Sequence, residues 1–270
     1  MPPPLPHLTF VGLGPRGPEG LAPAALAAVA QARAVFADDY TALLSQAVLD
    51  HLERARGAAI PRLGRARIEK GTEILEAAAL PGGAVLLVPG DPMAATTHVA
   101  LRVEALRRGL PVRLLFAPSV THTAFSEAGL QHYKSGRVVS LPYPEKSYAP
   151  TSPAERILEN RAAGLHTLVL LDIQAEPRRC MTANEAIYIL LGLGKRAGLD
   201  GIGPRTLCVA VARAGESDAL VRAGAAERLS ELDLGPPMHC LIVPGRLHFE
   251  EREALKVIGL AREEELPPQD

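Results

Sequence analysis

The chain has 270 residues, of which 47% are hydrophobic and 22% charged, so it is long enough for one large or two modest folded cores. Its formal net charge of −1 lacks the basic excess that a protein binding nucleic acid or an anionic membrane surface would carry. The proline-rich stretch at residues 1–7 has no signal-peptide pattern, and no segment is apolar enough to span a bilayer, so we expect a cytoplasmic protein.

The first predicted element is a short apolar strand, Leu8–Val11, which is followed by a glycine loop. The loop from Gly12 to Gly17 reads GLGPRG and matches the G-x-G-x-x-G pattern of dinucleotide-binding proteins. An acidic pair, Asp38 and Asp39, follows at about the 20-residue spacing expected for a ribose-binding carboxylate. The residues of this loop and their spacing to the acidic pair therefore match the pattern of a nucleotide-binding site.

Two prolines weaken that interpretation. In the dinucleotide fingerprint, free N–H groups at the start of a helix meet the pyrophosphate, whereas Pro15 and Pro18 remove two such donors here. The next helix is expected only from Pro23, a residue favoured in the first helical turn. The loop is therefore long and poor in donors, which disfavours a cofactor of the dehydrogenase type.

A second motif follows an apolar strand at Ala84–Val88, which Pro89 must end because proline cannot donate to a strand ladder. Gly90-Asp91-Pro92 then permits a sharp reversal. Asp91 either closes this turn with its own side chain or presents a carboxylate to a ligand, and both interpretations stay open. A helix over 94–108 is predicted next, with four candidate inner positions: Val99, Leu101, Val103 and Leu106.

The other predicted elements alternate between strand and helix along the chain. Strands are expected at Val35–Ala37, Val112–Phe116, Arg137–Leu141, Leu168–Leu171, Thr206–Ala212 and His239–Val243. Helices are expected at 23–34, 45–56, 68–80, 121–128, 153–163 (with Ser152 as cap), 182–195, 225–232 and 249–258. This alternation predicts an α/β protein with a mainly parallel sheet and helices on its faces. The alternation of strands and helices becomes less regular near Pro118, so we expect a domain boundary there, with an N-terminal domain at 1–117 and a C-terminal domain at 118–270.

Most signatures of chemistry are missing from the sequence. There is no G-x-S-x-G elbow, Walker loop, paired-cysteine zinc pattern or histidine pair at helical spacing, so we expect no metal. The three distant cysteines, Cys180, Cys208 and Cys240, suit buried thiols in a reducing compartment. Thr182 and Glu185 form a helix-capping pattern, which gives Glu185 a structural explanation.

The roles of two histidines stay open. His98 is either functional or a hydrogen-bonded surface group near a helix start, and His239 is either a wall of a cleft or a packed, satisfied histidine. What stands out instead is a set of small loops at predicted strand ends: 12–15, 90–92, 118–120, 171–172 and 212–215. Such loops expose backbone groups to a flat ligand and suit a nucleoside better than a phosphate.

Several blocks in order carry a likeness to a known family. They read VGLGPRGPEGL, ADDYT, VPGDPMAATTH, APS, GLQHYKSG, GLHTLVLLDI, MTANEA, ARAG and GPPMHCLIVPGRLH, and they extend from about Leu8 to His248. Together they resemble the diphthine synthases, the methyltransferases of the diphthamide pathway, most strongly those of archaea. More distantly, the first glycine loop and the Gly-Asp-Pro stretch are similar to the tetrapyrrole methylases.

The resemblance implies two α/β domains of the class III, tetrapyrrole methylase-like type, with S-adenosyl-L-methionine in the cleft between them, and a homodimer. It implies a protein substrate, translation elongation factor 2, whose histidine carries a 3-amino-3-carboxypropyl group. The amino group of that extension would be methylated, to the trimethyl form, leaving S-adenosyl-L-homocysteine and giving diphthine. The family's cofactor contacts would fall on Pro15, Asp91, Ala94, Ser119, Val120, Leu171, Ala214 and His239.

Some features of this interpretation stay open. The family's Asp-Ile-Thr segment after the glycine loop is replaced by residues 19–22, Glu-Gly-Leu-Ala, so no role is carried over from it. No catalytic residue is assigned, because Glu185, His98 and water are all conceivable bases. An aromatic face would suit a growing cation, for which Tyr40, Tyr133 and Tyr188 are candidates. The alternatives are a methylase acting on a corrinoid or porphyrinogen, and a non-catalytic nucleotide-binding or scaffold protein.

Overall fold

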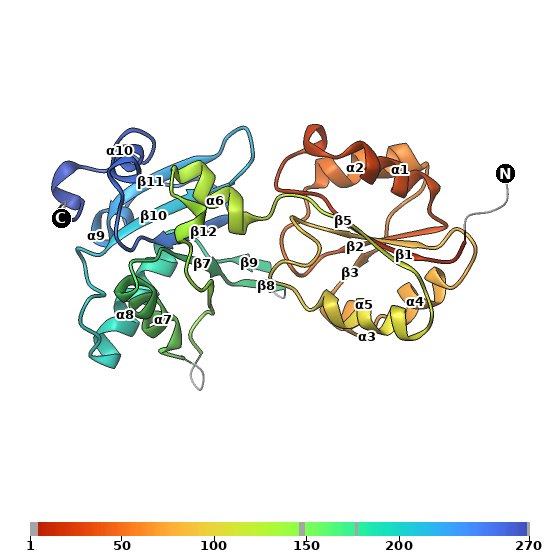
Figure 1. Ribbon diagram of the computed structural model, residues 1–270, viewed down its shortest axis with the longest axis horizontal. Helices are drawn as coiled ribbons and strands as arrows, with labels where there is room; N and C mark the ends of the chain where they lie inside the picture. Colours follow the sequence, from red (N-terminus) through yellow and green to blue (C-terminus); the bar gives the residue numbers. More distant parts are fainter. Residues whose placement is uncertain (1–4, 146–148, 176–177, 269–270) are drawn as a thin grey trace. The chain divides into compact units, whose positions relative to one another are not determined.

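The computed structural model describes residues 5–145, 149–175 and 178–268. The chain divides into two compact units, residues 1–120 and 121–270, and each is built on a five-stranded sheet with helices on both faces (Figure 1). The domain boundary expected between residues 117 and 118 stays a prediction.

The sheet of the first unit is parallel throughout. Its strands lie in the order β3-β2-β4-β1-β5, and every neighbouring pair is parallel. The mainly parallel sheet predicted from the alternating elements is thus present in this unit. Its elements are β1 (Leu8–Gly12), η1 (Pro18–Gly20), α1 (Pro23–Gln31), β2 (Ala34–Asp38), α2 (Gln46–Arg56), β3 (Arg62–Leu63), α3 (Arg65–Lys70), α4 (Thr72–Ala78), β4 (Ala84–Val88), α5 (His98–Arg107) and β5 (Val112–Leu115).

Helices α1 and α2 cover one face of this sheet, and α3, α4 and α5 cover the other (Figure 1). Strands β1 and β4 are buried along their whole length, which explains why their sequences are apolar except for Thr9 in β1. These two strands are neighbours, yet the connection after β1 leads to α1 on one face and that after β4 leads to α5 on the other. Such a reversal leaves an open place beyond the carboxyl ends of the two strands, where ligands of α/β proteins bind.

Two helix predictions in this unit were wrong in detail. The helix expected over 68–80 is two helices, α3 and α4, because Gly71 between them has a φ of +63°. A side chain at Gly71 would also clash, since its Cβ would lie 2.5 Å from Leu101 Cδ1.

The helix expected from residue 94 begins four residues later, at His98. Of its four predicted inner positions only Leu101 is buried, whereas Val99, Val103 and Leu106 are 58%, 39% and 52% exposed. The buried face instead carries His98, Leu101 and Ala105, which also have helical spacing. This helix carries apolar residues on more than one of its faces, so the periodicity of the sequence alone could not identify the buried face.

The second unit contains a mixed sheet in the order β11-β10-β12-β7-β6. Only β6 and β7 are parallel, and the three other pairs are antiparallel, so the prediction of a mainly parallel sheet was wrong here. The elements are α6 (Val120–Ala128), η2 (His132–Lys134), β6 (Val139–Leu141), α7 (Ser152–Ala162), β7 (Thr167–Leu171), β8 (Ile173–Ala175), β9 (Arg178–Cys180), α8 (Ala183–Ala197), β10 (Leu207–Ala212), β11 (Leu220–Ala225), α9 (Ala226–Leu229), β12 (His239–Val243), α10 (Phe249–Val257) and η3 (Glu263–Glu265).

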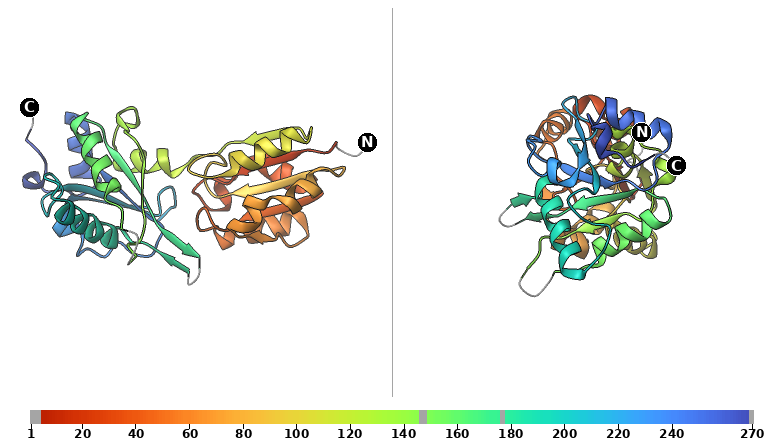
Figure 2. Two further views of the ribbon diagram at one scale, coloured as in Figure 1. Left: turned by 90° about the horizontal axis from the view of Figure 1, so that it is seen from below. Right: turned by 90° about the vertical axis from the view of Figure 1, so that its left-hand side faces the viewer.

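Helices α7, α8 and α9 pack their apolar residues against one face of this sheet. The β8–β9 hairpin projects from the body of the unit (Figure 2). The capping box predicted at the start of α8 is confirmed, with Thr182 as N-cap and Glu185 as its partner. The cap predicted for α7 was wrong, because Thr151 occupies the N-cap position and Ser152 is the first helical residue.

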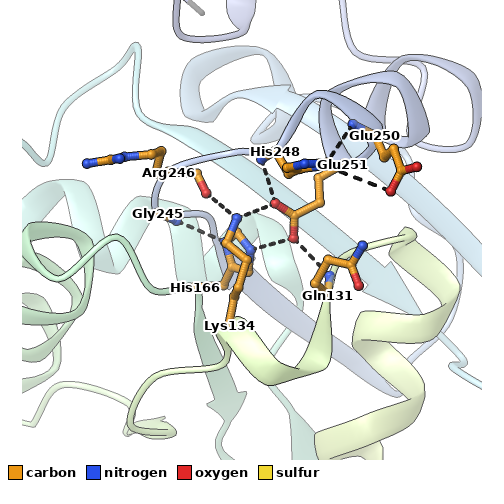
Figure 3. Close-up of polar contacts among 8 residues, drawn as sticks. All are labelled: Gln131, Lys134, His166, Gly245, Arg246, His248, Glu250 and Glu251. Atoms are coloured by element: carbon orange, nitrogen blue, oxygen red, sulfur yellow. Dashed lines mark hydrogen bonds and ion pairs between the residues drawn. The ribbon is translucent and has the colours of Figure 1, made fainter. Parts of the chain in front are cut away.

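A buried carboxylate ties three segments of the second unit together (Figure 3). Glu251 in α10 accepts hydrogen bonds from the Gln131 N–H at 2.9 Å and the His248 N–H at 2.8 Å. His166 Nε2 lies 2.9 Å from its Oε1, and Lys134 Nζ forms an ion pair with its Oε2. His166 accepts the Gly245 N–H at Nδ1, so its proton is on Nε2 and points at Glu251. The carboxylate therefore holds the segment before β6, the start of β7 and α10.

Burial alone would raise the pKa of Glu251, but hydrogen bonds from His166, the His248 N–H and Lys134 lower it to about 2. A carboxyl group with a depressed pKa stabilises the fold above its unfolded pKa of about 4.5 and loses that effect as the pH falls towards 2. The corresponding stabilisation at neutral pH is about 3 kcal/mol.

We expect Glu251→Gln to lower the free energy of unfolding at pH 7, and the difference from the wild type to shrink by about 1 kcal/mol at pH 4. Urea unfolding of both proteins at the two pH values measures this difference. The control is Glu253→Gln, which removes an exposed carboxylate of the same helix. A difference that stays constant between pH 7 and pH 4 would contradict the depressed pKa.

Candidate functional site

The loops after β1, β4 and β5 meet at the carboxyl edge of the first sheet. Gly14 and Gly90 form an antiparallel bridge in which each N–H donates to the other's carbonyl oxygen at 3.2 Å. A Cβ on Gly12 would lie 2.7 Å from Gly90 O and 2.9 Å from Pro92 Cδ. The loops therefore approach so closely that only glycine fits at position 12.

Asp91 closes the turn after β4 with one oxygen of its side chain. Its Oδ1 accepts the Met93 N–H at 2.8 Å, which confirms the predicted turn-forming role. Among the described residues Oδ2 has no hydrogen-bond donor, and the residue is only half-buried. The carboxylate can thus hold its turn and still accept a ligand hydroxyl. Ala95, just beyond Ala94, has a φ of +53°, a strained value for a residue with a Cβ.

Of the five residues predicted for a ligand in this unit, four lie in these three loops and the fifth, Val120, directly follows the third loop. Pro15 follows the bridge residue Gly14, and Asp91 and Ala94 belong to the loop after β4. Ser119 is buried in the loop after β5, where its Cα lies 3.9 Å from the position of a Cβ on Gly90. Val120 follows directly as the first residue of α6. The structure thus brings these positions to one edge of the sheet.

The three residues predicted in the second unit also share one edge of their sheet. His239 pairs with Ala212 across β12 and β10, and Cys240 pairs with Leu170 across β12 and β7. One further step in that register places Leu171 opposite His239, while Ala214 lies two residues beyond the end of β10. This edge is therefore a second cluster of candidate ligand contacts.

The imidazole of His239 has both ring nitrogens engaged. Its Nδ1 accepts the Ala183 N–H at 3.2 Å, so Nε2 carries the proton and donates to Pro236 O at 3.0 Å. Burial lowers the pKa of His239, which keeps the ring neutral. Of the two interpretations open for this residue, the packed and satisfied histidine is the one that the structure shows.

Arg213 supports the loop that carries Ala214, a role that the sequence did not reveal. Its guanidinium donates to Leu234 O at 3.0 Å and Pro236 O at 2.8 Å and pairs with Asp218 at 2.6 Å. Arg213 also has a φ of +51°. Backbone strain of this kind persists only where the surroundings hold it, and here the same side chain supplies the support.

Glu185 belongs to a polar cluster beside Asp172. Its carboxylate accepts the Tyr143 O–H at 3.0 Å and the Thr182 N–H at 2.9 Å and pairs with Arg179, whose guanidinium lies 4.1 Å from the centre of the Tyr143 ring. Burial raises the pKa of Glu185, but these hydrogen bonds outweigh it and keep the carboxylate charged. Burial and the bond to Glu185 raise the pKa of Tyr143 to about 12. Glu185 is thus structural and a poor base.

The remaining candidates are scattered. In the second unit, Tyr133 and Tyr188 are 77% and 79% exposed, and in the first the Tyr40 hydroxyl lies 2.9 Å from Thr97 Oγ1, so their role beside a cation stays a prediction. His98 is buried and faces Asp38, so of its two interpretations the hydrogen-bonded surface group was wrong.

The described part of the chain contains no cluster of three metal-ligating side chains and no helix that could cross a membrane. Cys208 and Cys240 are buried and form no disulfide, and Cys180 forms no disulfide either. Burial raises the pKa of Cys208 and of Cys240 to about 12, so these two are inert packing residues.

The parallel first sheet, its glycine-lined edge and the mixed second sheet define a protein of the tetrapyrrole methylase class, and the family model of the Tetrapyrrole (Corrin/Porphyrin) Methylases matches residues 7–230. The chain is 42% identical over 252 residues to a diphthine synthase of Methanothermobacter thermautotrophicus, covering 93% of this chain and 95% of the relative. It is 39% identical over 254 residues to that of Methanocaldococcus jannaschii, with 93% and 98% covered. Within this class, the chain belongs to the diphthine synthase family.

A solved structure agrees with this assignment. A crystal structure of diphthine synthase superimposes with a TM-score of 0.85 at 32% identity, covering 95% of this chain and 97% of that one. The resemblance inferred from the sequence blocks is thereby confirmed.

We expect Gly12→Ala to weaken the meeting of the three loops, because its Cβ has no room beside Gly90 O and Pro92. Overpacking of this kind costs about 1–3 kcal/mol, so the melting temperature should fall together with affinity for an S-adenosyl ligand. The control is Gly203→Ala, where no atom lies within 4 Å of the new Cβ. Calorimetry on both variants checks this, and equal behaviour would contradict the packing argument.

Proposed function

We propose that this protein is an S-adenosyl-L-methionine-dependent N-methyltransferase of diphthamide biosynthesis. Its substrate is translation elongation factor 2 bearing a 3-amino-3-carboxypropyl-histidine, whose amino group it methylates to the trimethyl form, giving diphthine. The observation that carries the proposal is the likeness to diphthine synthases over more than nine-tenths of the chain. The chain is a methyltransferase, and its exact acceptor and the number of methyl groups are the parts proposed here.

The loop edge of the first unit fits a nucleoside-containing methyl donor. The bridge between Gly14 and Gly90 and the tight fit at Gly12 bring main-chain groups to the edge with few side chains in the way. Asp91 Oδ2 is available to accept hydroxyl groups or to face a positive charge. When bound, S-adenosylmethionine supplies a methyl group on a positively charged sulfur.

We assign the cofactor contacts to residues of both units. In the first, Pro15, Asp91, Ala94, Ser119 and Val120 would contact it, and in the second, Leu171, Ala214 and His239 would do so. His239 would contribute its backbone and packing surface, because both its ring nitrogens are engaged. S-adenosyl-L-homocysteine would leave from the same groups.

Methyl transfer to an amine depends on in-line approach, an unprotonated nitrogen and exclusion of water. The engaged groups Glu185 and His239 favour a mechanism in which these residues orient and do not take the proton. We therefore propose that positioning provides most of the rate and that the amine proton leaves to solvent.

We expect Asp91→Ala to slow methylation of modified elongation factor 2 by about tenfold or more, because the turn and the charge are both lost. Mass spectrometry of the factor, incubated with S-adenosylmethionine and either protein, counts the methyl groups added. Wild-type protein that binds the cofactor but adds no methyl group to the modified factor would overturn the proposed acceptor, and tetrapyrrole precursors would be tested next.

A second variant, Asp91→Asn, separates the turn from the charge, because its amide oxygen can still accept the Met93 N–H. We expect unchanged melting temperature and weaker cofactor binding. Calorimetry with both S-adenosyl ligands then assigns the role of the carboxylate. Equal weakening indicates a ribose contact, whereas a larger loss for S-adenosylmethionine indicates attraction to its positive sulfur.

We also propose that the protein is a cytoplasmic homodimer. The exposed apolar side chains of α5, Val99, Val103 and Leu106, offer a surface that a second copy would shield from water. Light scattering should give twice the chain mass of 28.6 kDa. A mass of one chain at micromolar concentration would contradict the dimer.

A further inference from the structure

A buried acid and a buried histidine face each other beneath the loop that carries Asp91. Asp38 is the last residue of β2 and His98 the first residue of α5, and both side chains are fully buried. Asp38 Oδ2 lies 3.3 Å from His98 Nε2. We call these two residues the Asp38–His98 pair.

The other polar atoms of the pair are already engaged. Asp38 Oδ1 accepts the Tyr40 N–H at 2.8 Å and the Thr41 N–H at 3.1 Å. His98 Nδ1 lies 3.0 Å from Pro92 O. Because a carbonyl oxygen can only accept, Nδ1 must carry a proton and donate it to Pro92.

The two facing atoms, Oδ2 and Nε2, lack any other hydrogen-bond partner among the described residues. Without a proton between them, a lone pair on Nε2 would face a carboxylate oxygen in a dry interior, which is unfavourable. One proton shared by the two atoms satisfies both. The geometry therefore implies that the pair holds this proton, either as imidazolium and carboxylate or as imidazole and carboxylic acid.

The pair is connected directly to the ligand loop. His98 binds the carbonyl of Pro92, the residue after Asp91, and Pro92 Cδ is one of the atoms that fill the space beside Gly12. A second connection runs in parallel, since the Tyr40 hydroxyl lies 2.9 Å from Thr97 Oγ1 at the start of α5. The end of β2 thereby fixes where the loop after β4 lies.

We propose that Asp38 and His98 are positioning residues for the methyl donor. The proton that they share orients the imidazole, the imidazole holds Pro92, and Pro92 sets the place of Asp91 and Ala94 against the glycine loop. This inference rests on the proposed function, because it takes the loop at Asp91 as a cofactor contact.

Two variants keep a hydrogen bond between positions 38 and 98 and differ in the connection to Pro92. In Asp38→Asn, the amide N–H donates to a neutral His98 while its oxygen still accepts from Tyr40 and Thr41, so the ring and Pro92 stay in place. In His98→Gln, the amide N–H can replace Nε2 opposite Asp38, but nothing replaces the Nδ1 donor to Pro92. In both variants the buried side chain at position 38 therefore keeps a hydrogen-bond partner at position 98.

We expect His98→Gln and Asp38→Ala each to raise the Kd of S-adenosylhomocysteine by about tenfold, since each loses a buried hydrogen bond that places the loop. Asp38→Asn keeps the hydrogen bond to the His98 ring, so its Kd should stay much closer to that of the wild type than the Kd of Asp38→Ala. Calorimetry measures the three values. In methyl transfer, the KM for S-adenosylmethionine should rise in His98→Gln, while kcat at saturating cofactor stays within about threefold.

Leu52→Ala is the control for general loss of stability. Leu52 is fully buried in α2 on the other face of the sheet, so its truncation should lower the melting temperature without raising the Kd. A His98→Gln variant that binds like wild type would overturn the positioning role. An Asp38→Asn variant that loses as much affinity as His98→Gln, or a Leu52→Ala variant that does so, would overturn it as well. Wild-type protein that binds no S-adenosyl ligand would overturn the proposed function itself.

Discussion

The close approach of two neighbouring loops is the constraint on which the first unit depends. Strands β1 and β4 lie side by side, but their chains leave the sheet towards opposite faces. The loops can meet again above the strand ends because Gly12 has no Cβ to clash with Gly90 O, and because Gly14 and Gly90 both adopt a φ of +70° that favours glycine. The same glycines leave main-chain groups uncovered at this edge, so the packing of the loops and the proposed binding of a ligand would depend on the same residues.

Three ionisable side chains of the second unit hold segments of the folded chain together. Glu251 joins three segments, Glu185 caps α8 and holds Tyr143, and His239 connects β12 with the first turn of α8. Each of these side chains forms its hydrogen bonds with other residues of the same unit. Asp91 differs, because one of its oxygens completes a turn and the other remains for a ligand. Among the predicted residues it is therefore the one whose side chain can respond to the charge of a bound molecule.

The sequence predicted features that depend on neighbouring residues and missed features that depend on distant ones. Short, mainly apolar runs located β1 and β4, and Thr182 with Glu185 located the start of α8, because these signals are local. The antiparallel strands of the second unit were missed, since an alternation of strand and helix does not state which strands become neighbours. β11 was overlooked because its residues, LVRAGA, combine glycine and arginine with few β-branched side chains.

In the candidate site, too, features set by neighbouring residues were predicted and features set by distant residues were missed. The loops that gather at the first sheet edge follow strand ends, and strand ends can be read from proline and glycine. The partners of His98 and Arg213 could not be read, because Asp38 lies 60 positions away and Leu234 lies 21 positions away. The inner face of α5 was misjudged for a related reason: apolar residues occur on both of its sides, and only the packed sheet decides between them.

The bridge between Gly14 and Gly90 has a consequence for anyone who wishes to alter this protein's ligand preference. If the proposed ligand is held by main-chain groups, exchanging side chains would change its binding little, and any added Cβ at Gly12 would push the loops apart. Changes in loop length, which move whole peptide groups, would be the more productive route to a redesigned pocket.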